Sequence, residues 1–356
     1  MASVLAGQSL VQDKGVLRLH GLERLDHARW DAFVTACAEA SFFHLAGWQQ
    51  VLERAFGHRT HYLYAERGGE IVAVLPLAEI RSLLFGHALI STPFCVYGGV
   101  AGEDSEAREA LIEAACERAR ELGVDYLEMR NRRPVCPDWP RKDLYVTFRR
   151  EISPDPEENL KAIPRKQRAM VRKGIKAGLV GELGCDIDAL YQVYSESVRN
   201  LGTPVFAKRY LHILKEVFGE DCNVLTVQHE GRLLAGVMNF YFRDEVLPYY
   251  GGGTSEARRF KANDFMYWEL MRRSAERGIR VFDYGRSKKE TGSYAFKKNW
   301  GFEPEALSYE YYLVKARRMP DLSPKNPKYR LFIRAWQRLP VGVAQRLGPF
   351  LARYLG

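Results

Sequence analysis

The segment between Val281 and Pro304 carries the residues best suited to chemistry. It reads VFDYGRSKKETGSYAFKKNWGFEP, so three acids, five Lys and Arg residues and several aromatics lie in or after one short apolar run. The run Val281–Tyr284 predicts a buried strand that ends at Gly285, and the cations follow it on a loop and a short helix. Cations at the end of a strand can hold phosphates, because the strand fixes their backbone while their charged ends stay accessible. The segment therefore predicts a site for an anionic ligand.

Two side chains of this segment suit a reactive site, and each also has a structural alternative. Arg286 can bind a phosphate or a carboxylate through two parallel hydrogen bonds, or it can pair with Asp283 or Glu290. Asp283 can steer an ammonium group or accept its proton, or it can hold Arg286 in place. The other predicted substrate-binding residues of the segment are Tyr284, Lys288 and Lys298.

The elements that position these residues occur twice along the chain. Residues 65–130 and 227–286 resemble one another at an offset of roughly 155 to 160 residues, and each reads strand, turn, strand, strand, helix, strand. Helices are expected from about 105 to 122 and from about 264 to 277. Tyr97 and Tyr250 fall on corresponding turns of the two stretches, where a phenol can donate to a developing oxyanion or simply pack.

Length and layout together predict two domains. A chain of 356 residues exceeds one ordinary core. The expected class is α/β (α+β), with two tandem domains that are each a mixed sheet with covering helices. The proline-rich Ser153–Pro156 is the expected boundary. The predicted units are residues 1–152, residues 153–314 and a helical tail at residues 315–356.

A basic helix is predicted directly after this boundary, opening near Pro164. Its cations recur at three- and four-residue steps along one face. This face is either simply solvated or a platform for a polyanion, such as the acceptor end of a tRNA or a diphosphate head group. Its members are Lys161, Arg165, Arg168, Arg172 and Lys176, of which Arg168 and Arg172 are the predicted substrate contacts.

The tail carries the charge imbalance of the whole chain. Ten Lys and Arg residues and one acid lie between Lys315 and Gly356, so this segment alone carries the formal net charge of +9. Tyr329–Leu339 predicts an amphipathic helix with Arg330, Arg334 and Arg338 on one side and apolar residues on the other. The apolar side either packs on the protein's own body or lies in the anionic inner leaflet of a membrane.

Several classes of protein are disfavoured by composition. The six cysteines are scattered without a C-x-x-C pair, so no metal site or redox dithiol is expected. The first residues, MASVLAGQSLVQDKG, lack a basic leader and a sustained apolar stretch. No window reaches the roughly 18 apolar residues of a membrane span. We therefore expect a cytoplasmic protein, with peripheral contact at the inner face of the membrane as an option for the tail.

The sequence resembles the FemAB family of aminoacyl-tRNA-dependent peptidyltransferases, which consist of two acyltransferase-like domains of the GNAT type. In detail it resembles the FemAB-related branch associated with exopolysaccharide and exosortase (PEP-CTERM) gene systems. An F-K-x-x-W-G run after a D-Y-G-R strand is the most specific element. The matching residues are Phe43-His44 and Trp48, Pro76-Leu77, the basic helix, Gly202–Phe206, Tyr250-Gly251-Gly252, Phe282–Arg286, Phe296-Lys297 and Trp300-Gly301.

The resemblance implies acyl transfer from an activated ester or thioester to an amine. Implied donors are aminoacyl-tRNA or an acyl carrier, and the implied acceptor is a phosphorylated nucleotide- or lipid-linked saccharide or peptide. Lys297 matches the lysine that the resemblance associates with binding such phosphates, and its alternative is a plain surface lysine. Together with Asp283 and Tyr250, it is one of the predicted catalytic residues. A second enzyme hypothesis is an N-acyltransferase that uses acyl-CoA or acyl-carrier protein. A third hypothesis is a non-catalytic module that binds a glycolipid or phosphate group.

Coenzyme A is disfavoured, and no cofactor is predicted. A GNAT-type fold places the pyrophosphate of CoA on a glycine-bearing loop at a helix N-terminus. Here the second-half stretch Arg258–Asp264 has no glycine, and its first-half counterpart, Glu103–Glu106, is acidic. Backbone amides therefore have no obvious way to approach a pyrophosphate, although the basic residues of the second half partly substitute.

Overall fold

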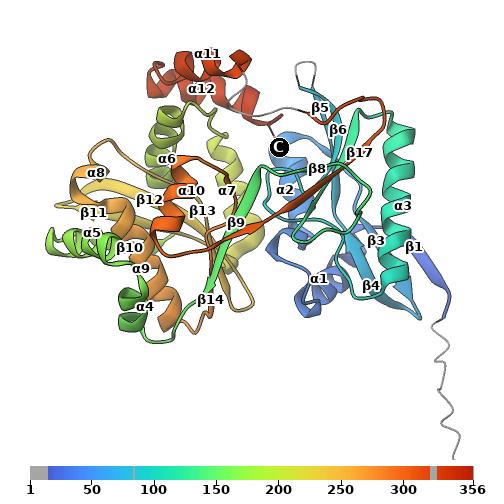
Figure 1. Ribbon diagram of the computed structural model, residues 1–356, viewed down its shortest axis with the longest axis horizontal. Coiled ribbons are helices and arrows are strands. Elements are labelled where there is room, and N and C mark those ends of the chain that lie inside the picture. The colour runs from blue at the N-terminus through green and yellow to red at the C-terminus, as the bar shows by residue number, and fades with distance from the viewer. Residues whose placement is uncertain (1–14, 83–84, 321–326, 356) are drawn as a thin grey trace, which may run out of the picture.

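The computed structural model describes residues 15–82, 85–320 and 327–355. Residues 1–14, which bear on the predicted lack of a leader, lie outside this part, as does the connector 321–326. Figure 1 shows two sheet-and-helix halves side by side, with the last two helices at one end of the molecule. The predicted α/β class, with mixed sheets and covering helices, is confirmed.

The first half is built around a six-stranded sheet and a smaller sheet of three strands. The larger sheet has the order β2 (Arg59–Thr60), β5 (Leu77–Ser82), β6 (Gly86–Ser91), β7 (Tyr126–Asn131), β17 (Ser308–Leu313) and β8 (Arg141–Lys142). The smaller sheet has the order β1 (Leu17–Gly21), β3 (Leu63–Arg67) and β4 (Glu70–Leu75). The helices are α1 (His27–Ala36), α2 (Gly47–Phe56) and α3 (Ser105–Leu122), with a short 3-10 turn at Phe42–His44.

The second half is built around an eight-stranded sheet. Its strands are β10 (Val180–Gly184), β11 (Cys222–His229), β12 (Arg232–Phe242), β13 (Glu245–Gly253), β14 (Val281–Asp283), β9 (Tyr145–Glu151) and β15 (Ser287–Lys288), with β16 (Pro304–Ala306) also on β9. Its helices are α4 (Pro156–Ala162), α5 (Arg165–Lys176), α6 (Ile187–Leu201), α7 (Lys208–Phe218), α8 (Ala257–Phe260), α9 (Ala262–Glu276) and α10 (Gly292–Asn299).

Each half contains one parallel strand pair joined by a helix, as the internal similarity predicts. β6 and β7 are joined by α3, and β13 and β14 are joined by α9. The α3 helix begins where Asp104 accepts a hydrogen bond from the backbone N–H of Ala107 at 3.1 Å, and it ends at Gly123 in the left-handed conformation. β13 and β14 pair at only two positions, Glu245 with Val281 and Val246 with Phe282. The strand ends beyond such pairs are where α/β sheets hold their ligands.

The two halves exchange strands. β9 precedes residue 152 in the sequence but lies in the second sheet, between β14 and β15. β17 precedes residue 314 but lies in the first sheet, between β7 and β8. Sheet membership therefore crosses both predicted boundaries, and Figure 1 shows the green β9 strand and the red-brown β17 strand on opposite halves.

An aromatic core joins the halves. The Phe42 ring, 1% exposed, stacks on Phe240 of β12 with 4.5 Å between ring centroids and lies 4.6 Å from Phe218 of α7. Trp48 of α2 lies 5.3 Å from the same Phe218 ring. Large buried rings dominate the energy of such contacts, so neither half keeps a complete core without the other.

The tail folds back onto the body. α11 (Pro327–Trp336) and α12 (Val341–Ala352) follow the connector, and the side chain of Arg330 lies outside the described residues. The inner side of α12 packs so closely that a Cβ on Gly348 would lie 2.7 Å from the carbonyl oxygen of Val205. His58 bonds the carbonyl oxygen of Arg353 at 2.8 Å. Of the two predicted arrangements, packing on the body is thus present. Among the described helices, none has the length and apolar character to cross a bilayer.

We predict that Phe42→Ala lowers the free energy of unfolding by about 3–5 kcal/mol, because it leaves a cavity between the halves. Urea denaturation followed by circular dichroism measures this. Leu25→Ala is the control, since Leu25 is 90% exposed and its truncation should change stability by no more than about 0.5 kcal/mol. A loss below about 1 kcal/mol for Phe42→Ala would contradict a shared core.

Candidate functional site

A cavity of about 430 Å³ opens at the carboxyl end of β7, in the first half. Its size is that of a site for a small molecule or a substrate head group. Four arginines line it, three of them from one short run that ends the strand. The lining residues that matter here are His44, Tyr97, Arg108, Arg130, Arg132 and Arg133.

The cavity carries an excess of positive charge. Arg108 lies 3.5 Å from Glu39, and Arg130 donates to Glu128 at 2.7 Å. The Arg132 guanidinium lies over the Tyr97 ring, 5.3 Å from its centroid. Within residues 15–82, 85–320 and 327–355, neither Arg132 nor Arg133 forms an ion pair. Two guanidinium groups thus remain for an anionic ligand.

Glycines shape the cavity wall. Gly98 has a φ of 144°, and a Cβ there would lie 2.4 Å from Thr92 Oγ1. A Cβ on Gly99 would lie 1.7 Å from Asn131 Oδ1, so the loop passes directly against the end of β7. Only glycine allows this close approach.

His44 supports that wall and is neutral. The backbone N–H of Ser41 donates to His44 Nδ1 at 3.1 Å, so Nε2 carries the proton and donates to the carbonyl oxygen of Gly99 at 2.9 Å. Burial lowers the pKa of His44 to about 4. With both ring nitrogens engaged, His44 holds the loop in place.

Tyr97 connects the cavity to the second half, and it meets the predicted Asp283. Its hydroxyl donates to Asp283 Oδ2 at 3.0 Å and lies 2.6 Å from Thr147 Oγ1. Asp283 also accepts from the backbone N–H of Gly285 at 2.7 Å. Burial raises the pKa of the Asp283 carboxyl, and the bonds from Gly285 and Tyr97 oppose that rise.

The corresponding tyrosine contact from the second half is made by Tyr249. Its hydroxyl donates to the carbonyl oxygen of Phe94 at 2.9 Å, so each half sends one tyrosine into the other. Tyr250, the predicted catalytic residue, lies with its hydroxyl 2.7 Å from that of Tyr210, and it is buried. The packing alternative for Tyr250 is therefore the arrangement observed.

Lys297 is placed differently from the predicted phosphate clamp. The side chain is buried, and its ammonium donates to the carbonyl oxygens of Tyr284 at 2.7 Å, Gly285 at 3.0 Å and Arg286 at 3.0 Å. An ammonium has three donors, so all of them are used within the protein. Lys297 thus clamps the backbone that follows β14. Burial lowers the pKa of Lys297 to about 7, against the attraction of Asp283.

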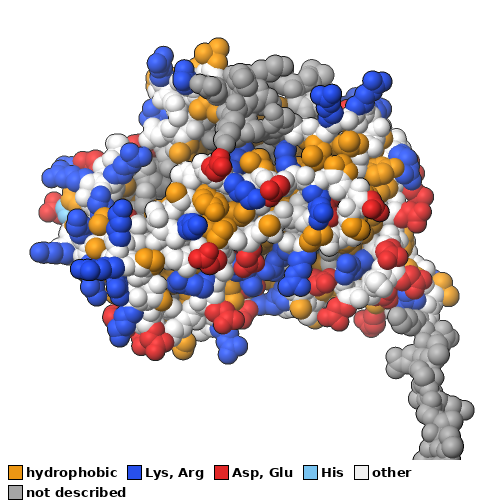
Figure 2. Space-filling view, in the orientation of Figure 1, with side chains coloured by type: hydrophobic (Ala, Val, Ile, Leu, Met, Phe, Trp, Pro, Cys, Tyr) orange, Lys and Arg blue, Asp and Glu red, His pale blue; other side chains and the backbone are white. Residues whose placement is uncertain are grey.

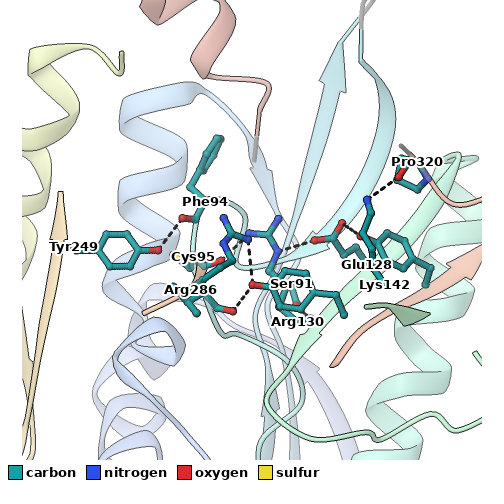
Figure 3. Close-up of polar contacts among 12 residues, drawn as sticks. Ser91, Phe94, Cys95, Glu128, Arg130, Lys142, Tyr249, Arg286 and Pro320 are labelled. Carbon is teal, nitrogen blue, oxygen red and sulfur yellow. Dashed lines mark hydrogen bonds and ion pairs between the residues drawn. The ribbon is translucent and has the colours of Figure 1, made fainter. Parts of the chain in front are cut away.

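Arg286 meets Arg130 at the junction of the halves. Arg286 donates to the Tyr309 hydroxyl at 3.1 Å and lies over the Tyr145 ring, 4.9 Å from its centroid. The Arg130 guanidinium lies 5.5 Å from the centroid of the Tyr309 ring and donates to the carbonyl oxygen of Cys95 at 2.8 Å. Figure 3 shows the two guanidinium groups beside one another, with Glu128 next to Arg130. Arg286 is held by the Tyr145 and Tyr309 rings and the neutral Tyr309 hydroxyl, whereas Arg130 forms an ion pair with the Glu128 carboxylate.

The remaining predicted residues of this segment are spread around the junction. Tyr284 is buried in an aromatic cluster, 4.7 Å from Phe302 between ring centroids. The Lys288 ammonium lies 5.9 Å from the centroid of the Tyr145 ring, and Lys298 is exposed on α10. The structure thus brings Asp283, Tyr284, Arg286 and Lys297 together, with Asp283, Tyr284 and Lys297 buried and Arg286 half-buried.

Arg168 and Arg172 lie on a separate basic surface. α5 packs on α9 so closely that a Cβ on Gly174 would lie 2.8 Å from Phe265 Cβ, which turns the cations outward. Figure 2 shows Lys and Arg side chains gathered over the α5 end of the molecule. A hollow of about 370 Å³ on this surface is lined by Arg165, Arg168, Ala169, Arg172, Lys173 and Lys176.

A GNAT-type fold would place a pyrophosphate at the N-terminus of α3 or α9. A carboxylate occupies each position: Asp104 caps α3, and Asp264 lies in the first turn of α9. At α3 the Asp104 carboxylate caps the helix and accepts from Arg67 Nε at 3.1 Å. At α9 the buried Asp264 accepts from Trp300 Nε1 at 3.2 Å and from Gln167. A bound pyrophosphate would meet like charge at either position.

Comparisons with known proteins support an acyltransferase fold. Residues 162–298 match the family model described as an acetyltransferase (GNAT) domain. The structure is similar to that of FemX, with 17% identity and a TM-score of 0.65 over 89% of this chain and 100% of that one. It is also similar to a tandem GNAT protein from the clavulanic acid biosynthesis pathway, with 15% identity and a TM-score of 0.53 over 86% and 100% of the two chains.

A third similar structure is the C-terminal domain of a putative lysylphosphatidylglycerol synthetase from Agrobacterium fabrum. It has 15% identity and a TM-score of 0.54 over 82% of this chain and 92% of that one. A search of curated proteins gave no match. These findings show the tandem GNAT fold and support a GNAT-type acyltransferase.

The cavity arginines do not stand out in the sequence, although a signal for them exists. Arg130 ends the first of the two similar stretches as Arg286 ends the second, and Asn131, Arg132 and Arg133 follow Arg130 directly. The same reasoning that singles out cations after the second strand applies to the first. Arg108 gives no such signal, because its helix brings it to the cavity only in the fold.

We predict that the stability gained from Lys297 rises with pH between about 7 and about 10.5, because the unfolded lysine keeps a proton that the folded one releases near pH 7. Unfolding free energies of the wild type and Lys297→Met, measured by urea denaturation from pH 6.5 to 9, should diverge by up to about 1.4 kcal/mol per pH unit in favour of the wild type. Parallel pH profiles of the two proteins would contradict the buried position of this ammonium.

Proposed function

We propose that the protein is an acyltransferase that forms an amide bond on a phosphate-bearing precursor of the cell envelope or of an exopolysaccharide. Aminoacyl-tRNA is the proposed donor. The observation that carries this proposal is the cavity at the end of β7, with two arginines outside any ion pair of the described chain. We also propose that the protein belongs to the PEP-CTERM-associated branch of the FemAB family that its sequence resembles.

Arg132 and Arg133 are the proposed phosphate contacts. A guanidinium offers parallel N–H donors that match two phosphate oxygens, and such charge-assisted bonds are among the stronger ones in proteins. Stacking of Arg132 on Tyr97 fixes its plane before the ligand arrives. The role of Lys297 and Arg286 is different: they hold the strand end against which Tyr97 and Asp283 rest.

The proposed reaction joins an amine nitrogen of the acceptor to the acyl carbon of the donor. The C–N bond forms, the ester C–O bond breaks, and the released hydroxyl of the donor takes up a proton as the amine loses one. Asp283 is the proposed intermediate acceptor of that proton: it takes the proton from the amine through the Tyr97 hydroxyl and returns it to the released hydroxyl, because a buried carboxylate of raised pKa takes up a proton more readily than an exposed one.

The basic surface of α5 is the proposed contact for the donor. Its twelve residues contain six Lys and Arg residues and no acid, which suits a nucleic acid backbone. Asp104 and Asp264 argue against CoA at the helix N-termini. We place the reaction in the cytoplasm, where charged tRNA is found, with peripheral contact between the tail and the inner face of the membrane.

A thioester-dependent N-acyltransferase is the second candidate. The observation in its favour is the match of residues 162–298 to the acetyltransferase domain. Incubation of the protein with charged tRNA and an amine acceptor separates the candidates, because tRNA deacylation that depends on the acceptor is expected only for the first. Mass spectrometry of co-purified CoA or acyl carrier would favour the second. Binding without turnover of either donor would favour a non-catalytic binding module.

We predict that Arg132→Ala weakens the binding of inorganic pyrophosphate by roughly 10- to 100-fold, the effect of losing a charged hydrogen-bond donor. Isothermal titration calorimetry measures this. Arg132→Lys should recover part of the affinity, because it keeps the charge but not the paired donors. The matched control is Arg118→Ala on the outer side of α3, which should leave binding unchanged. Equal affinity for Arg132→Ala and wild type would overturn the assignment.

We predict that the double variant Arg168→Gln, Arg172→Gln weakens tRNA binding and makes it less dependent on salt. Because two cations that meet phosphates are removed, the plot of log affinity against log salt concentration should become shallower by about two. Filter binding at several salt concentrations measures the slope. The control is Arg258→Gln, Arg259→Gln, which removes two exposed cations from α8. If both double variants change the slope alike, α5 has no special role.

A further inference from the structure

The outward surface of the last two helices concentrates exposed apolar side chains. Leu331 is 76% exposed, Phe350 69% and Leu347 48%. We call this surface the tail face. It consists of Leu331, Phe332, Val343, Leu347, Phe350 and Leu355, six of the twelve large apolar residues that are exposed in the described chain. Single exposed apolar residues are common, but a cluster of this kind marks a contact surface.

The tail face lies on the side of the helices opposite to the side that packs on the body. Val343, Leu347 and Phe350 recur at steps of four and three residues, which puts them on one side of α12. Ala344, Gly348 and Ala352 form the other side, and all three are buried against the body. Trp336 is buried on α11 in the same way. Packing on the body therefore uses the inner side and leaves the tail face uncovered by the described chain.

The positive charge around the tail face favours some binding partners over others. Pro327–Leu355 contains six Lys and Arg residues and no acid. Arg334, Arg338 and Arg346 are exposed. Figure 2 shows apolar and basic side chains next to one another at the top of the molecule, where Figure 1 places α11. A second copy of this chain would bring its own Arg334, Arg338 and Arg346 against these three, so pairing of two tail faces is opposed by like charge.

We infer that the tail face binds the surface of an anionic lipid bilayer. An anionic bilayer binds protein surfaces that combine two features. Apolar side chains enter the boundary between headgroups and acyl chains, and arginines around them contact the anionic headgroups. The apolar residues cover only one side of α11 and α12, and the opposite side packs on the body. This arrangement is that of a helix pair that lies on the bilayer surface. The enzyme proposed above would thereby meet a lipid-linked acceptor at the membrane. The binding itself does not depend on the proposed reaction.

Sedimentation with vesicles tests this inference on the full-length protein. Vesicles of 70% phosphatidylcholine and 30% phosphatidylglycerol should bind the wild type, and pure phosphatidylcholine vesicles should bind it at least tenfold more weakly. Leu347→Ser, Phe350→Ser should lower binding to the anionic vesicles at least tenfold, because both changes remove apolar area from the bilayer. Each change among Arg334→Gln, Arg338→Gln and Arg346→Gln should lower it by about fivefold at low salt.

Leu25→Ser is the matched control, since Leu25 is exposed on the first half, away from the tail. It should bind like the wild type. The inference is overturned if the wild type fails to bind anionic vesicles, if the Leu347 and Phe350 variant binds them unchanged, or if sedimentation velocity shows a dimer that this variant abolishes. Circular dichroism of each variant verifies that the fold is intact. The vesicle assay involves no turnover, so its result is separate from that of the acyl transfer assay.

Discussion

Two like charges at the junction of the halves, the buried Arg130 and the half-buried Arg286, set the constraint on which the rest of the structure depends. Arg130 from the end of β7 and Arg286 from the loop after β14 both lie against Tyr309, and Arg130 has Glu128 as its carboxylate partner. Buried charges are costly unless hydrogen bonds compensate them. Here ring faces, carbonyl oxygens and one carboxylate share that task. Both strand ends must therefore be held firmly, or the guanidinium groups would lose their partners.

The observed contacts provide that rigidity from both sides. Lys297 fixes three successive carbonyl groups after β14, and Gly99 fits directly against the end of β7. Tyr97 and Tyr249 each cross to the other half. The exchanged strands β9 and β17 add backbone pairing to these side-chain contacts. The positive charge that this framework gathers extends into the cavity, where Arg132 and Arg133 face the space left for a ligand.

Much of the fold could be predicted from the sequence, because its signals are local. The α3 helix has an N-cap and a terminal glycine, and the two stretches of similar pattern correspond to the two parallel strand pairs. The strand exchange could not be predicted. The alternation in β17 indicates a strand, but which sheet it joins depends on contacts with β7, about 180 residues earlier in the chain.

The candidate site was predictable only in part. The proximity of Asp283, Tyr284, Arg286 and Lys297 follows from one segment, but the direction of each side chain depends on distant residues. Tyr145 and Tyr309 draw Arg286 inward, and carbonyl oxygens rather than a ligand receive the Lys297 ammonium. The cavity lies in the first half, whereas the sequence pattern directs attention to the second. The cavity arginines follow β7, which corresponds to β14 in the duplicated pattern. The internal similarity could therefore have pointed to them.

The most direct test of the central claim is a crystal structure of the protein with a nucleoside diphosphate sugar. The cavity at the end of β7 should contain the diphosphate, with its oxygens within hydrogen-bond distance of the Arg132 and Arg133 guanidinium groups. A diphosphate bound at the N-terminus of α9 or beside Lys297, with the β7 cavity empty, would contradict the claim.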